Sequence, residues 1–428
     1  MSYINLFSTT SRVEAPYIIL TIGDYTFGVY DKTVKNNKLD ENGNLYSEYH
    51  VTFPNYLTSI DIVKVNGAVN TYTISMVYAM RPGDDPNLIE KIFSSISNTR
   101  NIKISYGDYN SPTFAFKEEN AIITNITSNL NASNSNIVYN ITCVSEALNL
   151  TAGKFNFPAR YAKPSDVLKE LLYSSKYGLL EIFYGMRDKE LVQTKGLIIS
   201  DDKKVQLEAK TNISVFDYIN YLTKCMSSIT DAGNKLLKNS CYTLTVIDDY
   251  KGEFGGPYFK INKISKNVRA TNSLDMYEID IGYPGQNIVT NFTINNNETY
   301  SILYNYSGKM NQADYVYRIN NEGEVSYVYS PSLSNSSELL KTTEADKNWW
   351  SLVTQYPISA SLTIRGLLRP AILMSYVKIN VYFYGRKHLS SGIYIITKQQ
   401  DRIDGNGYSS TLTLTRVEGD DNLWLLKQ

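Results

Sequence analysis

The pattern of hydrophobic and polar positions predicts β-strands over most of the chain. Residues 376–383 alternate between the two kinds, and because successive side chains of a strand point to opposite faces, they predict a half-buried strand. The β-branched run 393–397 follows a polar break and is expected to pair with it as a hairpin. Residues 411–417 alternate leucine and threonine after the turn 404–407 and predict a third strand. The apolar face of the first strand comprises Val377, Ile379, Val381 and Phe383.

The first part of the chain is also predicted to consist mainly of β-strands. Residues 17–23 and 25–30 flank a Gly-Asp pair and predict a hairpin. Residues 86–96 carry the first helical pattern, with a proline where a helix start tolerates it. A β-barrel or sandwich with one helix is therefore expected for residues 1–157. Its further strands are predicted at 57–64, 71–78, 102–106, 113–117, 119–128 and 136–144.

From Pro158 onward, apolar residues at helical spacing appear beside the strand patterns. One helix is predicted from Pro164, because proline and aspartate early in the run are start signals. A second is predicted after a cap at Thr211 or Asn212, and strands follow at 242–247 and 258–264. These elements predict a small α+β module. The buried stripe of the second helix is expected to be Val215, Phe216, Ile219 and Leu222, with Cys225 packed one turn later.

Strands return in the last part of the chain, with one more helical pattern among them. The run 344–353 reads as that helix. A single helix among strands matches the first module, so residues 286–428 are expected to repeat its type of fold. The strands are predicted at 288–294, 300–307, 315–319 and 325–329, before the three described above.

The order of features from residue 361 onward resembles the C-terminal end of the tail hub family. That family comprises baseplate hubs of contractile phages, the late control protein D group and the hub part of type VI secretion spike proteins. Matching features are the strand 361–364, Gly366, Pro370, the run Ser391–Ile396, a turn with Asp404, and the run Gly407–Arg416. Residues 287–294 resemble the strand by which the family enters its second barrel. Met374–Ser375 stands where the family often has a glycine.

The resemblance implies a mainly β chain: two tail-tube-like β-barrel domains at residues 1–157 and 286–428, separated by an inserted α+β domain at 158–285. It also implies a structural virion protein, a homotrimeric baseplate hub that joins a six-fold tail tube to a three-fold central spike and forms part of the tail channel. The implied partners are the tube and spike proteins, other baseplate proteins and the tape measure protein. Assembly in the bacterial host cytoplasm is expected.

The amino-acid composition narrows the classes of function that remain for the chain. Lys+Arg and Asp+Glu number 42 each, and no long basic run occurs, so sequence-specific binding of nucleic acid is not expected. No stretch reaches the roughly 20 apolar residues of a membrane helix, and the start lacks the features of a signal peptide. Tyrosine is abundant, at 36 residues, which suits two-faced sheets and subunit interfaces. An AT-rich coding sequence would explain the tyrosines equally well.

Candidate chemistry is sparse. Three cysteines without a CxxC pair, and two histidines at His50 and His388, do not make a zinc site, and free thiols in a reducing compartment are expected. No nucleophile elbow, P-loop or dinucleotide glycine pattern occurs. We therefore expect no cofactor, no metal and no enzymatic activity. Four acid pairs were considered as glycosidase carboxylates, but each lies in a turn-like segment typical of solvated acids: Asp84–Asp85, Asp201–Asp202, Asp248–Asp249 and Asp420–Asp421.

An apolar segment follows the last predicted strand and is expected to dock on a partner or a neighbouring subunit. Its residues are Leu423, Trp424, Leu425 and Leu426. The alternative function from another class is a carbohydrate-recognising tail or adhesion module, in which tyrosine and tryptophan rings stack on sugars. With no hydrolase, β-helix or oligonucleotide-binding barrel before Gln428, the spike and any wall hydrolase are expected to be separate chains.

Overall fold

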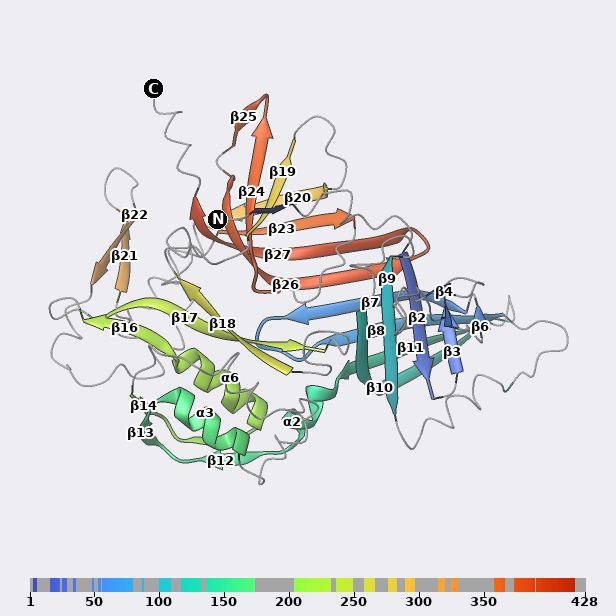
Figure 1. Cartoon of the computed structure of the whole chain (residues 1–428), viewed down its shortest axis with the longest axis horizontal. Coiled ribbons are helices and arrows are strands. Elements are labelled where there is room, and N and C mark those ends of the chain that lie inside the picture. The colour runs from blue at the N-terminus through green and yellow to red at the C-terminus, as the bar shows by residue number, and fades with distance from the viewer. Residues whose placement is uncertain are drawn as a thin grey trace, which may run out of the picture.

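The computed structural model of the chain is a mainly β protein with a small helical portion, as the sequence predicts (Figure 1). Among the residues described here, no helix is long and apolar enough to cross a membrane. The structure describes residues 3–5, 16–23, 25–28, 34–35, 48–49, 53–54, 56–79, 87, 100–108, 117–131, 136–173, 204–231, 236–248, 258–265, 276–282, 289–296, 315–319, 325–329, 358–365, 373–388 and 390–419.

In the described part of the chain, 16 strands belong to one continuous sheet. Its first half, which we call the first sheet module, runs in the order β7-β8-β11-β10-β9-β2-β3-β6. The hairpin predicted around Gly23 is confirmed as β2 and β3. The strands are β2 (Pro16–Ile22), β3 (Tyr25–Gly28), β6 (Phe53–Pro54), β7 (Leu57–Val65), β8 (Thr71–Ala79), β9 (Asn101–Asp108), β10 (Lys117–Asn131) and β11 (Asn136–Ser145).

The other half, the last sheet module, contains the strands that carry the family-like motif. The predicted hairpin of 376–383 with 393–397 is confirmed by antiparallel pairing of β24 with β26, and the third strand by pairing of β26 with β27. β19 pairs with β24 in parallel. The strands are β1 (Tyr3–Asn5), β19 (Met276–Ile281), β20 (Val289–Asn296), β23 (Ile358–Arg365), β24 (Tyr376–Phe383), β25 (Arg386–Lys387), β26 (Gly392–Asp404) and β27 (Gly407–Gly419).

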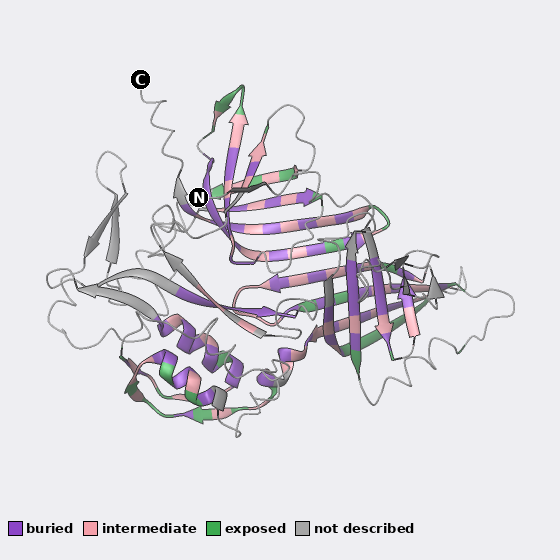
Figure 2. Cartoon of the chain, viewed as in Figure 1, coloured by how far each residue is buried: buried purple, intermediate pink, exposed green. Residues whose placement is uncertain are grey.

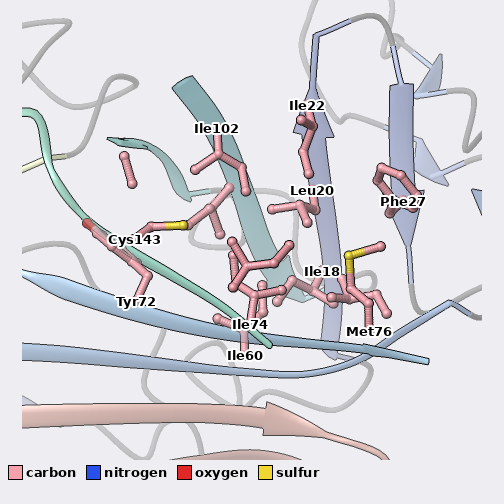
Figure 3. Close-up of a cluster of buried hydrophobic side chains, with 14 of the residues drawn as sticks. Ile18, Leu20, Ile22, Phe27, Ile60, Tyr72, Ile74, Met76, Ile102 and Cys143 are labelled. Carbon is pink, nitrogen blue, oxygen red and sulfur yellow. The ribbon is translucent and has the colours of Figure 1, made fainter. Parts of the chain in front are cut away.

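The long strand β26 joins the two halves of the sheet. Its first residues pair with β24, and residues 398–403 pair with β7, while β27 lies along its other side. Each half encloses its own hydrophobic cluster. In the first, side chains of β2, β3, β7, β8, β9 and β11 point toward one another (Figure 3). The strand predicted at 71–78 is confirmed as β8, whose inward face buries Tyr72, Ile74, Met76 and Tyr78.

The inserted module packs two helices and a small sheet around one core. α6 contacts β17, α3 contacts α6, and both helices carry buried positions (Figure 2). The stripe predicted for α6 is buried, and Cys225 is buried one turn later, as expected. The module comprises η3 (Glu146–Leu148), α2 (Asn149–Ala152), β12 (Phe155–Phe157), β13 (Arg160–Ala162), α3 (Pro164–Tyr173), β14 (Val205–Leu207), β15 (Lys210–Ile213), α6 (Val215–Cys225), β16 (Ser227–Asp231), β17 (Leu236–Ile247) and β18 (Tyr258–Ser265).

Two details differ from the sequence prediction. α6 is capped by Ser214, whose hydroxyl accepts from the Asp217 backbone N–H, and not by Thr211 or Asn212. Thr211 and Asn212 instead belong to β15, in which Asn212 has a φ of +56°, in the left-handed region. The domain boundaries at residues 157 and 285 stay predictions. Elements on one side of each boundary pack with the module on its other side: η3 and α2 join the core of the inserted module, and β19 joins that of the last sheet module.

Several predicted elements lie outside the described residues. These are the helices 86–96 (apart from Asn87, in a turn) and 344–353, and the strand 300–307. The polar loop after β3 holds a short pair, β4 (Val34–Lys35) with β5 (Glu48–Tyr49). The strands predicted at 315–319 and 325–329 are confirmed as the hairpin of β21 (Tyr315–Ile319) and β22 (Val325–Tyr329).

Met374, which stands where the resembled family often has a glycine, has a backbone conformation that favours glycine. Its φ is +64°, in the left-handed region that favours glycine. The strain is offset by burial of the side chain in the last sheet module and by a hydrogen bond of 2.7 Å from its backbone N–H to the Ile396 carbonyl. The turn before β24 therefore forms without the glycine.

Gly282, directly after β19, lies against the backbone of β24. Its φ is +79°, and a Cβ there would overlap the Tyr382 carbonyl oxygen. We expect Gly282→Ala to lower the free energy of unfolding by more than about 2 kcal/mol, because the left-handed conformation alone costs an alanine roughly 1–2 kcal/mol. Urea unfolding of the purified protein measures this.

Gly385→Ala is the matched control. Gly385 has a similar φ of +74° but open space around it, so its variant should show the conformational cost alone. Equal destabilisation by the two variants would show that the contact between Gly282 and β24 contributes nothing.

Candidate functional site

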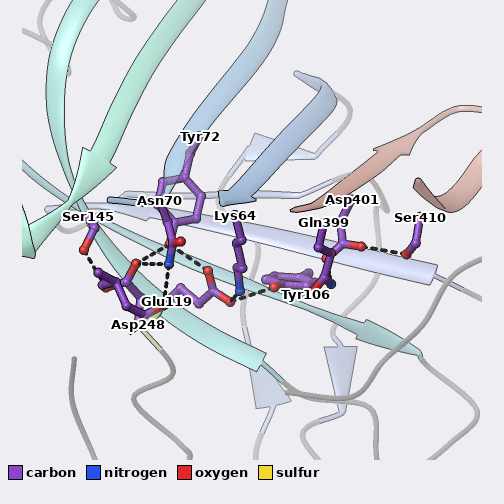
Figure 4. Close-up of polar contacts among 11 residues, drawn as sticks. Lys64, Asn70, Tyr72, Tyr106, Glu119, Ser145, Asp248, Gln399, Asp401 and Ser410 are labelled. Carbon is purple, nitrogen blue, oxygen red and sulfur yellow. Dashed lines mark hydrogen bonds and ion pairs between the residues drawn. The ribbon is translucent and has the colours of Figure 1, made fainter. Parts of the chain in front are cut away.

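A cluster of buried polar side chains lies where the three modules meet, and we call it the junction cluster (Figure 4). It joins the first sheet module, the end of β17 in the inserted module, and β26 and β27. Its members are Lys64, Asn70, Tyr72, Tyr106, Glu119, Ser145, Asp248, Gln399, Asp401, Tyr408 and Ser410.

The centre of the cluster is an ion pair between Lys64 and Glu119. Lys64 donates to Oε1 of Glu119, and the Tyr106 hydroxyl donates to the same oxygen at 2.7 Å. The Tyr72 hydroxyl donates to Oε2 at 2.7 Å. Both oxygens of a fully buried carboxylate are therefore satisfied, as the cost of burying a charge requires.

Asp248 brings the inserted module into the cluster. It directly follows β17 and is 1% exposed. Its Oδ2 lies 2.7 Å from the Asn70 amide nitrogen and 3.0 Å from the Tyr72 hydroxyl, and its Oδ1 accepts from Ser145 Oγ at 2.6 Å. One carboxyl group of the inserted module thus contacts side chains next to β8 and at the end of β11.

The last sheet module contributes the third buried carboxyl group of the cluster. Asp401 of β26 accepts from Gln399 at 2.7 Å and from Ser410 of β27 at 2.6 Å. The ring of Tyr408 packs edge-on against Tyr106, with centroids 6.5 Å apart. Polar and aromatic contacts therefore continue from the first sheet module into β26 and β27.

The backbone of the turn between β7 and β8 adds contacts to the other two modules. The Asn66 N–H donates to the Thr397 carbonyl at 3.1 Å, and the Gly67 N–H donates to the Leu244 carbonyl of β17 at 2.8 Å. The Gly67 carbonyl accepts from the Asn220 side chain of α6 at 2.9 Å. This turn holds the inserted module and the last sheet module against the first.

The electrostatics of the cluster follow from its burial. Burial acts to lower the pKa of Lys64, but the charge and hydrogen bond of Glu119 outweigh it and the pKa is raised. Burial, and then the neighbouring carboxylates, raise the pKa values of Tyr72 and Tyr106 well above the ordinary value, so both hydroxyls keep their protons. Burial, and then the charge of Glu119, raise the pKa of Asp248 from 3.8 to about 6.

The arrangement is suited to holding modules together. Within the described residues, no group of three or more His, Cys, Asp or Glu side chains is placed to hold a metal ion. The side chains of the junction cluster are engaged with one another and lie inside the protein. The cluster buries one ion pair, and the hydrogen bonds of Asp248 fix the end of β17 against the first sheet module.

The sequence-predicted residues have mixed outcomes. Leu423, Trp424, Leu425 and Leu426 lie outside the described residues, as do His50 and three of the four acid pairs. The expectation that Asp248 is a solvated acid is wrong, because the residue ends a strand that runs into the junction. His388 contacts Ser390, with 2.8 Å from Nδ1 to Oγ.

Sequence reasoning missed the junction cluster, although a signal was present. Lys64 continues the inward phase of Ile60 and Ile62, and Glu119 has the inward phase of Ala121 and Ile123. A charged side chain at an inward position of a strand indicates a buried partner of opposite charge. The sequence does not indicate that these two residues pair with each other, because Lys64 and Glu119 are 55 positions apart.

Glu119→Gln tests the ion pair. The substitution keeps a side chain that the two tyrosines can contact but leaves the Lys64 ammonium buried without its counter-charge. We expect a loss of about 3–5 kcal/mol in the free energy of unfolding, measured by denaturant titration.

The combined variant Lys64→Met/Glu119→Gln is the control, because it removes the uncompensated charge. It should recover a large part of the loss, as replacement of a whole buried pair costs far less than its disruption. A double variant as unstable as the sum of the two single variants would contradict an interaction between the two charges.

The comparisons with known proteins find structural likeness only. No family model matches the chain, and no curated protein matches it. Among solved structures it is similar to a tail protein from Neisseria meningitidis MC58, with 8% identity, TM-score 0.47, and 96% of this chain and 98% of that one covered. It is also similar to the 43 kDa tail protein of prophage MuSo2 from Shewanella oneidensis, with 10% identity, TM-score 0.49, and 94% and 98% covered. A type VI secretion component of E. coli has 8% identity, TM-score 0.42, and 84% and 73% covered.

Proposed function

We propose that this chain is a structural baseplate hub of a phage-type tail, acting as a homotrimer between a tail tube and a central spike. The sequence resemblance in residues 361–416 supports it, and the strands of that motif pair with one another in one antiparallel arrangement. The other proposed partners are neighbouring baseplate proteins and the tape measure protein, and the proposed location is the virion tail.

The single observation that carries the proposal is the continuous sheet through β26. Two sheet modules in one chain share hydrogen bonds along residues 398–403, so their relative position is fixed by backbone pairing. Three such chains would present six sheet modules. A closed three-fold ring of this kind can meet a six-fold partner on one side and a three-fold partner on the other.

The proposed work is therefore mechanical. A hub must keep its shape while subunits on both sides bind it, and the junction cluster ties the inserted module to this frame through Asp248 and the turn at Gly67. The balanced charge, 42 acidic and 42 basic residues, suits packing among many neighbours better than long-range attraction of a charged ligand.

The first experiment measures the mass and symmetry of the purified protein. Light scattering should give three times the chain mass of 48.5 kDa, and negative-stain images should show a three-fold ring. A protein that remains a monomer or dimer at all accessible concentrations, with or without a candidate spike chain, would contradict the proposal.

Replacement of Leu423, Trp424, Leu425 and Leu426 by serine tests the proposed docking segment. The variant should lose trimer formation or spike binding while its unfolding midpoint stays unchanged. Leu130→Ser is the control, because Leu130 is an apolar side chain that is 71% exposed elsewhere on the sheet. Full retention of trimer and spike binding in the segment variant would exclude docking.

A carbohydrate-binding role is the second candidate, and one exposed feature favours it. Tyr384 and Gly385 form the two-residue turn between β24 and β25, both with positive φ, and Tyr384 is 92% exposed. Phe383, beside it, is 66% exposed, with the ring centroids 4.7 Å apart. Exposed aromatic rings are surfaces on which sugar rings can stack.

A glycan-binding screen separates the two functions. A hub should bind no glycan, whereas an adhesion module should bind one and lose at least tenfold in affinity in the variant Phe383→Ala/Tyr384→Ala. Binding that the double variant leaves unchanged would exclude this turn as the site.

A further inference from the structure

We propose that Asp248 is a proton-dependent latch between the inserted module and the first sheet module. Under mildly acidic conditions Asp248 takes up a proton and donates a hydrogen bond to the Tyr72 hydroxyl, which in turn donates to Glu119. These two hydrogen bonds hold the inserted module more tightly against the first sheet module. This inference does not depend on the trimer or on any partner. It rests on the number of hydrogen atoms available in the junction cluster.

The Tyr72 hydroxyl faces two carboxyl groups but carries one hydrogen. Its oxygen lies 2.7 Å from Glu119 Oε2 and 3.0 Å from Asp248 Oδ2. A hydroxyl donates once, so only one of these contacts can use its hydrogen. If both carboxyl groups are ionised, the other contact brings two oxygen atoms together with no hydrogen between them, which is repulsive.

A proton on Asp248 removes this conflict. Asp248 Oδ2–H then donates to Tyr72, and Tyr72 donates to Glu119, which stays ionised beside Lys64. Ser145 still donates to the other Asp248 oxygen, and its own oxygen accepts from the Ala147 N–H at 3.1 Å. Atoms balance, because one proton from solvent is gained by one carboxylate and no other group changes its charge.

Glu119 is the better candidate to remain ionised. It accepts from Lys64 and Tyr106 on Oε1, so a cation and a hydroxyl already stabilise its charge. Asp248 accepts from the neutral groups of Asn70 and Ser145, and Lys64 is directed to Glu119. The cluster thus holds more carboxyl groups than ammonium groups.

Other titratable groups around Asp248 do not change this assignment. The tyrosines stay protonated, and burial raises the pKa of the Cys143 thiol to about 12. Among the described titratable groups of the elements packed here are Lys64 of β7, Tyr72 of β8, Tyr106 of β9, Glu119 of β10, Cys143 of β11, Glu146 of η3, Asp401 of β26 and Tyr408 of β27.

The direction of the pH effect follows from the raised pKa. Because the pKa of Asp248 is about 6 when latched and 3.8 ordinarily, the latched form binds the proton more tightly. The extra stabilisation is complete below about pH 4 and is lost as the pH rises through about 6. Between pH 5 and pH 7 the equilibrium between closed and open latch should shift roughly tenfold toward open.

The amide of Gly67 is a direct reporter, because its hydrogen bond to the Leu244 carbonyl crosses the same contact. Hydrogen–deuterium exchange of a peptide covering residues 65–70, corrected for the intrinsic pH dependence of exchange, measures the opening. In the wild-type chain, protection at pH 5 should exceed that at pH 7 by roughly tenfold. In Asp248→Asn, which carries no titrating proton there, protection should be the same at both pH values.

Two further variants keep the outcome decisive. Tyr72→Phe removes the hydroxyl between the carboxyl groups and should reduce the pH dependence even if Asp248→Asn folds poorly. Asp404→Asn, an acid in the β26–β27 turn, should keep the wild-type dependence. A wild-type chain with equal protection at both pH values overturns the proposal. So does an Asp248→Asn variant with wild-type pH dependence, because another group would then be titrating.

Discussion

The burial of the Lys64–Glu119 pair is the constraint on which the junction depends. Two charges withdrawn from water are tolerable only if each lone pair and proton has a partner, and these partners come from different strands. The first sheet module therefore cannot complete its own interior without Tyr72 and Tyr106 in place. Asp248 and Asp401 extend the same requirement to the other two modules.

Hydrophobic packing and polar pairing have separate tasks in this chain. Each module has an apolar cluster built mainly from its own strands and helices, and Ile403 and Tyr408 of the last sheet module join that of the first. Apolar contacts are non-directional and leave the relative orientation of modules loosely specified. The hydrogen bonds of the turn at Gly67 and of Asp248 are directional, so they select one arrangement.

Much of the strand pattern could be read from the sequence because alternation is a local property. Leu412 and Leu414 are buried between threonines, as their spacing predicts, and the stripe of α6 is buried as its helical spacing predicts. The junction was not predictable in this way. Asp248 looked like half of a solvated acid pair, and its burial depends on Asn70 and Ser145, which are 178 and 103 positions away. The cap of α6 was placed too early because Thr211, Asn212 and Ser214 are all capping residues, and local preference does not choose among them.

The pairing of β26 with β7 also determines when the sheet can be completed during synthesis of the chain. Gln400 contacts Asp61 of β7 across 339 positions, so the edge of β7 lacks this partner until β26 has been synthesised. The first sheet module must wait with one strand edge unsatisfied, a state in which strands readily pair with foreign chains. Lys64 and Asp61 on that waiting edge place charges where a mispaired strand would have to bury them. The residues that stabilise the finished junction therefore also discourage wrong partners while it is incomplete.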